Sequence, residues 1–92
     1  MITRTFEVLI DEDGLTVEEL ASACAVSCEW IERHVQGGLI EVERSETMRF
    51  TSVQLLRARR LAEIERTFDA NDELAAFVVD LIEEVERLRG RR

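Results

Sequence analysis

The sequence predicts a mainly α-helical fold with a short N-terminal strand, a small β-hairpin and a long C-terminal helix. Three observations predict it: helix-capping patterns recur along the chain, an apolar stripe with helical spacing lies near the C-terminus, and proline is absent. With only four glycines as well, the boundaries between elements come mostly from helix caps. A chain of 92 residues supports one core, which predicts a single domain over residues 1–92.

The first predicted element is a strand. Ile2, Phe6, Val8 and Ile10 alternate with polar residues, which is the period of a half-buried strand. The acidic run at 11–13 ends it.

Two short helices and a tight turn are predicted over about 16–37. Thr16 and Glu19 have the spacing of a capping box, which opens the first helix. Ser27 is a good N-cap for the second helix, and Gly37-Gly38 permits the left-handed backbone that ends it.

A hairpin is predicted over about 39–50, with strands at 39–42 and 48–50. Thr51 and Gln54 then form a second capping box, which opens a helix over about 52–68. Apolar residues lie on two opposite sides of this helix, so we expect it to make contacts on both.

The last helix is predicted over about 71–89, with Asn71 as its N-cap. Its apolar stripe is typical of a helix that packs lengthwise on another helix, and it predicts a homodimer through this helix. The alternative is a helix folded back entirely on its own domain. The predicted dimerisation residues are Leu74, Val78, Leu81, Val85 and Leu88.

The charge is strongly negative and unevenly distributed. Twenty acidic residues face twelve arginines, and residues 1–50 carry a net charge of −7 of the total −8. Phosphate backbones require basic side chains, so the N-terminal half favours a basic partner over nucleic acid. No apolar run is long enough for a membrane span and no signal peptide is evident, so we expect a cytoplasmic protein with reduced cysteines.

In this order, the predicted elements form a winged helix-turn-helix arrangement. The segments 15–21, 26–27 and 38–40 resemble the N-terminal domain of MerR-type transcription regulators. A longer resemblance is to the CbpM family, and it implies binding to the J-domain of CbpA, a DnaJ-like co-chaperone, with inhibition of its stimulation of DnaK. The segments that carry this second resemblance are 28–31, 38–41, 48–51, 55–60 and 81–88.

The second helix departs from DNA-reading MerR proteins. Those proteins typically carry Arg where this chain has Glu32, and Tyr where it has Arg33. Its outward face has a net charge of −1, so we expect no tight binding to double-stranded DNA. A MerR-type DNA-binding regulator nevertheless remains the alternative, and an acidic protein that neutralises its partner, such as an antitoxin or a DNA mimic, is a third reading.

The J-domain reading assigns partner binding to the acidic faces of the second and last helices. Trp30 has two interpretations, as core packing or as an anchor that contacts the partner. The predicted partner-binding residues are Glu29, Trp30, Glu32, Arg33, Asp80, Glu83 and Glu84.

No catalytic or metal-binding constellation is evident, so no enzyme activity and no cofactor are predicted. His34 is the only histidine and, with Cys24 and Cys28, cannot complete a four-ligand zinc site. Cys24 lies on an apolar stripe and is expected to be buried. Cys28 follows a helix cap, which would lower the pKa of its thiol, but Glu29 opposes that shift.

One basic cluster remains, Arg57, Arg59 and Arg60 on the third predicted helix. These arginines either form ion pairs and hydrogen bonds within the fold or are a residual nucleic-acid patch.

Overall fold

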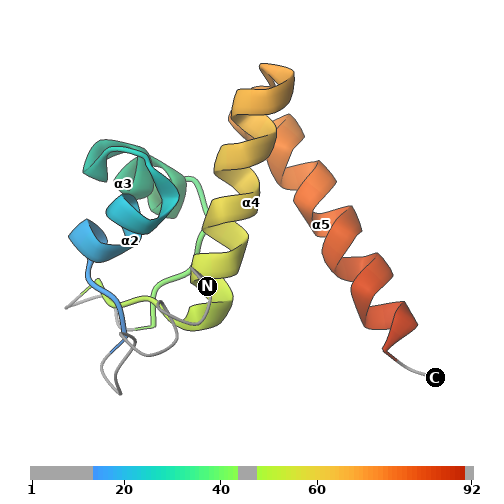
Figure 1. Cartoon of the computed structure of the whole chain (residues 1–92), viewed down its shortest axis with the longest axis horizontal. Coiled ribbons are helices and arrows are strands. Elements are labelled where there is room, and N and C mark those ends of the chain that lie inside the picture. The colour runs from blue at the N-terminus through green and yellow to red at the C-terminus, as the bar shows by residue number, and fades with distance from the viewer. Residues whose placement is uncertain (1–13, 44–47, 91–92) are drawn as a thin grey trace. The chain divides into compact units, whose positions relative to one another are not determined.

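The computed structural model describes residues 14–43 and 48–90, and these ranges form four helices. They are α2 (Val17–Cys24), α3 (Cys28–Gln36), α4 (Ser52–Phe68) and α5 (Asp72–Arg89) (Figure 1). The predicted mainly α-helical class is therefore confirmed. The predicted strand at 2–10 and the hairpin tip at 44–47 lie outside the described residues.

The chain divides into two compact units, Met1–Arg59 and Arg60–Arg92, so that α4 contributes to both. Each unit is described by itself, and the prediction of a single domain stays a prediction. No helix in the described ranges is both long enough and apolar enough to cross a bilayer.

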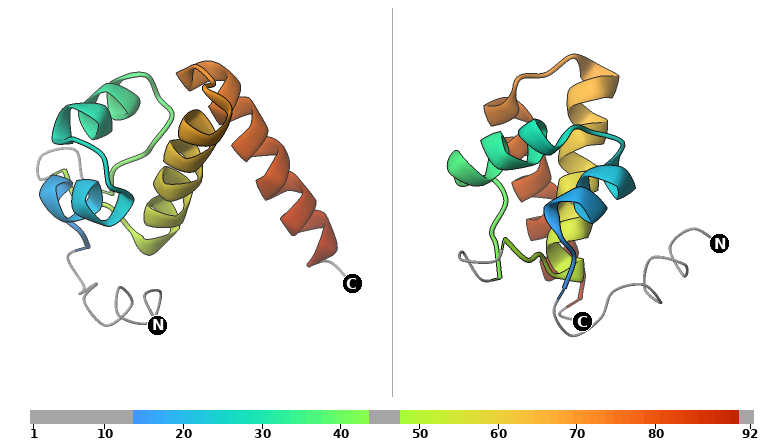
Figure 2. Two further views of the ribbon diagram at one scale, coloured as in Figure 1. Left: turned by 45° about the horizontal axis from the view of Figure 1, so that its top comes forward. Right: turned by 90° about the vertical axis from the view of Figure 1, so that its left-hand side faces the viewer.

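In the first unit, α2 and α3 lie side by side and pack directly against one another (Figure 2). Thr16 and Glu19 form both hydrogen bonds of the predicted capping box, at 3.0 and 2.9 Å. Ala25 takes the left-handed conformation that turns the chain (φ 59°), and the Ser27 hydroxyl accepts a hydrogen bond from the Trp30 N–H. Sequence capping thus correctly predicted both helix starts.

The predicted hairpin is not found among the described residues, which contain no strand ladder. Phe50 pairs instead with Leu15, through an isolated antiparallel bridge with hydrogen bonds of 2.8 and 3.0 Å. The two predicted arms share one described hydrogen bond, from the Glu43 N–H to the Arg49 carbonyl. The bridge therefore connects the entry of α2 to the entry of α4.

Side chains of α4 supply the hydrogen bonds that a partner strand would have supplied to residues 39–42. Gln54 Oε1 accepts the Glu41 N–H at 3.0 Å, and Arg57 Nε donates to the Leu39 carbonyl at 2.6 Å. The second capping box is correspondingly half formed. Thr51 accepts the Gln54 N–H, but the Gln54 side chain binds the loop.

The core of the first unit consists of apolar residues from α2, α3, the loops and the start of α4. Its fully covered members include Leu20, Ile31, Ile40, Phe50 and Ala58.

Helix α4 does not bury both of its apolar sides equally. The side that carries Leu55, Ala58 and Ala62 is buried, as expected for a contact surface. On the opposite side, Val53 and Phe68 are 68% and 72% exposed. Leu61, near the middle of the same side, is fully buried, so the predicted second contact side is covered at its centre and exposed at both ends of the helix.

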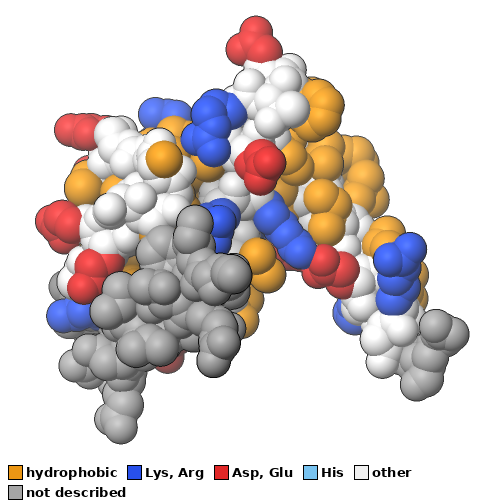
Figure 3. Space-filling model, viewed as in Figure 1, with side chains coloured by type: hydrophobic (Ala, Val, Ile, Leu, Met, Phe, Trp, Pro, Cys, Tyr) orange, Lys and Arg blue, Asp and Glu red, His pale blue; other side chains and the backbone are white. Residues whose placement is uncertain are grey.

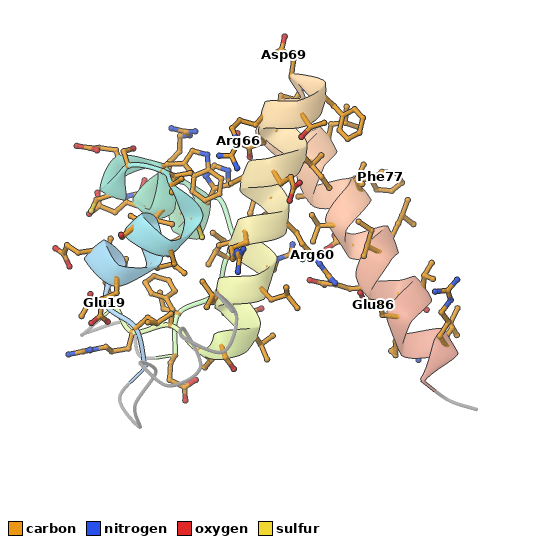
Figure 4. The ribbon with its side chains drawn as sticks, in the orientation of Figure 1. Glu19, Arg60, Arg66, Asp69, Phe77 and Glu86 are labelled. Atoms are coloured by element: carbon orange, nitrogen blue, oxygen red, sulfur yellow. The ribbon has the colours of Figure 1, made fainter. Side chains whose placement is uncertain are left out.

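The second unit is a helical hairpin. Asp69 takes a left-handed conformation (φ 52°) after α4, and Asn71 caps α5 by accepting the Leu74 N–H at 2.8 Å. The Arg60 guanidinium binds both carboxylate oxygens of Glu86, so that the first residue of the unit is fastened to the last turns of α5 (Figure 4).

Candidate protein-interaction surface

Among the described residues of the first unit, the exposed charge is almost entirely negative. All six acidic residues described there are exposed, whereas Arg33 is the one exposed arginine among the four described. Acidic side chains project along the outer edge of α2 and α3 (Figure 3). The acidic residues are Glu18, Glu19, Glu29, Glu32, Glu41 and Glu43.

Three of these carboxylates act electrostatically on Cys28, the first residue of α3. Partial burial, together with the negative charges of Glu18, Glu29 and Glu32, raises the pKa of the Cys28 thiol. The raised pKa agrees with the opposing effect expected from Glu29. Glu18 comes from α2, and the sequence analysis did not include it. The tight turn between the helices was the only signal that could have placed it beside α3.

We define the acidic face as Glu18, Glu29 and Glu32. It is built on two capped helices that pack against each other, so its carboxylates project from a fixed scaffold. A surface that carries three carboxylates attracts a positively charged partner. The arrangement suits recognition of a basic surface.

Trp30 is half-buried beside this face. Its ring stacks on His34, with ring centroids 3.7 Å apart and an interplanar angle of 23°. His34 is fully buried, and its Nδ1 lies 2.8 Å from the Trp30 carbonyl oxygen. His34 thus lies buried against the Trp30 ring, while Trp30 itself keeps an accessible part.

The predicted basic cluster has largely structural contacts. Arg57 holds the loop through the Leu39 carbonyl, and Arg60 pairs with Glu86. All three arginines of the cluster, including Arg59, are half-buried. Hydrogen bonds within the fold, rather than a nucleic-acid patch, account for Arg57 and Arg60.

The predicted acidic patch of α5 is weaker than that of α3. Asp80 and Glu84 are exposed, but Glu83 is half-buried. Glu84 forms an ion pair with Arg87 one turn away, which offsets its charge. Since α3 and α5 belong to different units, each surface is considered separately.

The predicted dimerisation stripe of α5 is accessible. Val78 is half-buried, and the other four stripe residues are between 49% and 53% exposed. Hydrophobic side chains follow α5 on the molecular surface (Figure 3). The covered residues of α5 are Ala75, Ala76 and Val79.

No protein-family model matches the chain, and neither a curated protein nor a solved structure is significantly similar to it.

Proposed function

We propose that the chain is an interaction protein that binds the J-domain of a CbpA-like or DnaJ-like co-chaperone and inhibits its stimulation of DnaK. The observation that carries the proposal is the acidic face, which is exposed and has Arg33 as its one exposed basic neighbour among the described residues of its unit. The residue-level resemblance to CbpM selects the J-domain among basic partners. The proposed scaffold is a MerR-like winged helix-turn-helix.

In this proposal, Glu18, Glu29 and Glu32 meet basic side chains of the J-domain. Complementary charge mainly accelerates association, whereas a less polar contact controls dissociation. The accessible part of Trp30 is the proposed anchor, and Arg33 lies beside it on the same helix. Occupying the basic surface of the J-domain would exclude DnaK. This role needs neither catalysis nor a cofactor, and it places the chain in the cytoplasm with its partner.

The same face is poorly suited to the alternative role of a MerR-type DNA-binding regulator. A helix that enters the major groove lies between two phosphate backbones, and Glu29 and Glu32 would be repelled there. We therefore expect no retardation of promoter DNA in an electrophoretic mobility assay at moderate salt. Sequence-selective retardation at nanomolar protein would instead favour the regulator.

The decisive experiment is surface plasmon resonance with an immobilised CbpA-type J-domain. The double variant Glu29→Arg and Glu32→Arg should associate about tenfold more slowly than the wild type. The association rate of the wild type should also fall steeply with added salt, because salt screens charges beyond roughly 10 Å. A matched control, Glu63→Arg with Glu73→Arg, changes the net charge equally but lies in the second unit.

The possible outcomes test the proposed partner and the proposed electrostatic mechanism separately. Equal slowing by the control variant would show that net charge, not the acidic face, steers association. Tight binding insensitive to salt and to both variants would refute the electrostatic mechanism. Failure of any J-domain to bind would refute the proposed partner. In a DnaK ATPase assay, the wild type should reduce J-domain stimulation, and the face variant should reduce it less.

A further inference from the structure

Both backbone polar groups of Trp30 are held by side chains of α3 and its cap. The Trp30 N–H donates a hydrogen bond of 3.0 Å to the hydroxyl oxygen of Ser27. The Trp30 carbonyl oxygen lies 2.8 Å from Nδ1 of His34, four residues later on the same helix. A carbonyl oxygen can only accept a hydrogen bond, so Nδ1 carries the proton and is the donor. The main chain at Trp30 is thus fixed at its N–H and at its carbonyl.

The imidazole of His34 also stacks on the indole of Trp30. Side chains four residues apart lie on the same face of a helix, which brings the two rings together. Their centroids are 3.7 Å apart and their planes are inclined by only 23°. The hydrogen bond from Nδ1 fixes the plane of the imidazole, since rotation of that ring would break it. Of the staggered conformations open to an indole side chain, the stack therefore favours one.

Histidine supplies something at position 34 that an apolar residue could not. The side chain is fully buried, and burial of a polar ring costs free energy unless its nitrogen atoms find partners. Leucine would fill such a site without this cost. It could neither stack on the indole nor donate to the Trp30 carbonyl. The two contacts that distinguish histidine from leucine here are both contacts with Trp30.

An ordered indole matters because Trp30 is only half-buried. A side chain that is mobile in the free protein must be immobilised when a partner binds, and this lowers the affinity. A side chain already held in its bound orientation avoids that loss. The contacts with His34 therefore favour a preorganised contact residue over a mobile one.

We propose that His34 is a positioning residue that holds the indole of Trp30 in the orientation that the J-domain contacts. The inference rests on the proposed function, in which Trp30 is the anchor. His34 has no exposed surface of its own and acts through Trp30. Loss of the stack should accelerate dissociation of the complex roughly two- to tenfold. The association rate, which the acidic face controls, should change little.

Two apolar substitutions isolate the stack. His34→Leu and His34→Phe both remove the Nδ1 donor, but only phenylalanine keeps a flat ring. In surface plasmon resonance on an immobilised CbpA-type J-domain, His34→Leu should dissociate two- to tenfold faster than the wild type, and His34→Phe should stay closer to the wild type. Far-UV circular dichroism checks that both variants fold. Wild-type dissociation of a folded His34→Leu variant would overturn the proposal.

A double-mutant cycle shows whether His34 acts through Trp30. In a Trp30→Ala background there is no indole to position, so adding His34→Leu should not accelerate dissociation further. A merely structural histidine would instead have the same effect in both backgrounds. That result would overturn the proposal.

Nitrogen-15 relaxation of the Trp30 indole N–H tests the positioning in the protein alone. Its order parameter should approach about 0.85 in the wild type, as in a rigid backbone, and should fall below about 0.6 in His34→Leu. An indole that is equally rigid in both proteins would overturn the proposal whether or not a J-domain binds. If the order parameter falls as expected but no J-domain binds, the positioning of Trp30 by His34 stands and the proposed partner is refuted.

Discussion

Gly14 and Gly38 both have backbone conformations in the left-handed region, with φ of +83° and +79°, but their surroundings differ. A Cβ added at Gly14 would lie 2.6 Å from the Phe50 carbonyl oxygen, whereas a Cβ at Gly38 would meet nothing within 4 Å. Alanine at the two positions therefore introduces the same backbone penalty with and without a collision.

The collision at Gly14 has a structural target. The Phe50 oxygen is the acceptor of the 2.8 Å hydrogen bond from Leu15, so relieving the contact must open the bridge between the two segments. A left-handed alanine costs roughly 1–2 kcal/mol, and each lost hydrogen bond about 1 kcal/mol. We expect Gly38→Ala to lower the free energy of unfolding by about 1 kcal/mol and Gly14→Ala by about 3 kcal/mol.

Urea denaturation followed by far-UV circular dichroism measures both losses, provided that the slope of the transition is unchanged. In thermal unfolding, the difference of about 2 kcal/mol corresponds to a melting temperature lower by roughly 8–16 °C in a chain of this size. Equal losses for the two variants, within about 0.5 kcal/mol, would refute the argument that the close approach at Phe50 fixes the bridge.

The remaining predictions concern a helix cap, a thiol and an ion pair. Asn71→Ala should cost about 1 kcal/mol by removing the cap on the Leu74 N–H, while Asn71→Ser should retain most of it, as measured by urea denaturation. The raised pKa of the Cys28 thiol leaves a smaller fraction of thiolate than a free cysteine has, so alkylation of a Cys24→Ala variant should be slower than alkylation of a cysteine peptide. Adding Glu29→Gln and Glu32→Gln should accelerate the reaction. An unchanged rate would exclude the charges of these two residues as a cause of the raised pKa. Arg60→Ala should cost at most about 1 kcal/mol, because the Glu86 side chain that it binds is 53% exposed; a larger loss in thermal unfolding would show a role beyond the pair.

Capping patterns predicted most of the fold because each is a local rule that tertiary contacts did not override. Thr16, Ser27 and Asn71 all cap the helices that the sequence assigned to them. The hairpin was not confirmed among the described residues, because its hydrogen-bond partners are not a local property. The backbone at 39–42 needs hydrogen-bond partners, and the sequence does not reveal that Gln54 and Arg57 supply two of them from a helix.

The sequence likewise predicted part of the candidate site. Glu29 and Glu32 could be placed on the exposed side of α3 from helical periodicity alone, and the structure places them there. Glu18 was missed because its proximity to α3 depends on the angle at which the chain turns through Ala25, which no local pattern specifies.

The stacking of Trp30 on His34 gives this protein a built-in optical reporter. Trp30 is the only tryptophan in the chain, so its near-ultraviolet absorption and emission are not mixed with those of another indole. Its ring is half-buried and held against one neighbour, so its spectrum depends on local solvent and on that stacking geometry. A ligand that docks beside Glu29 should shift the emission maximum, and titration could follow its binding without any attached dye.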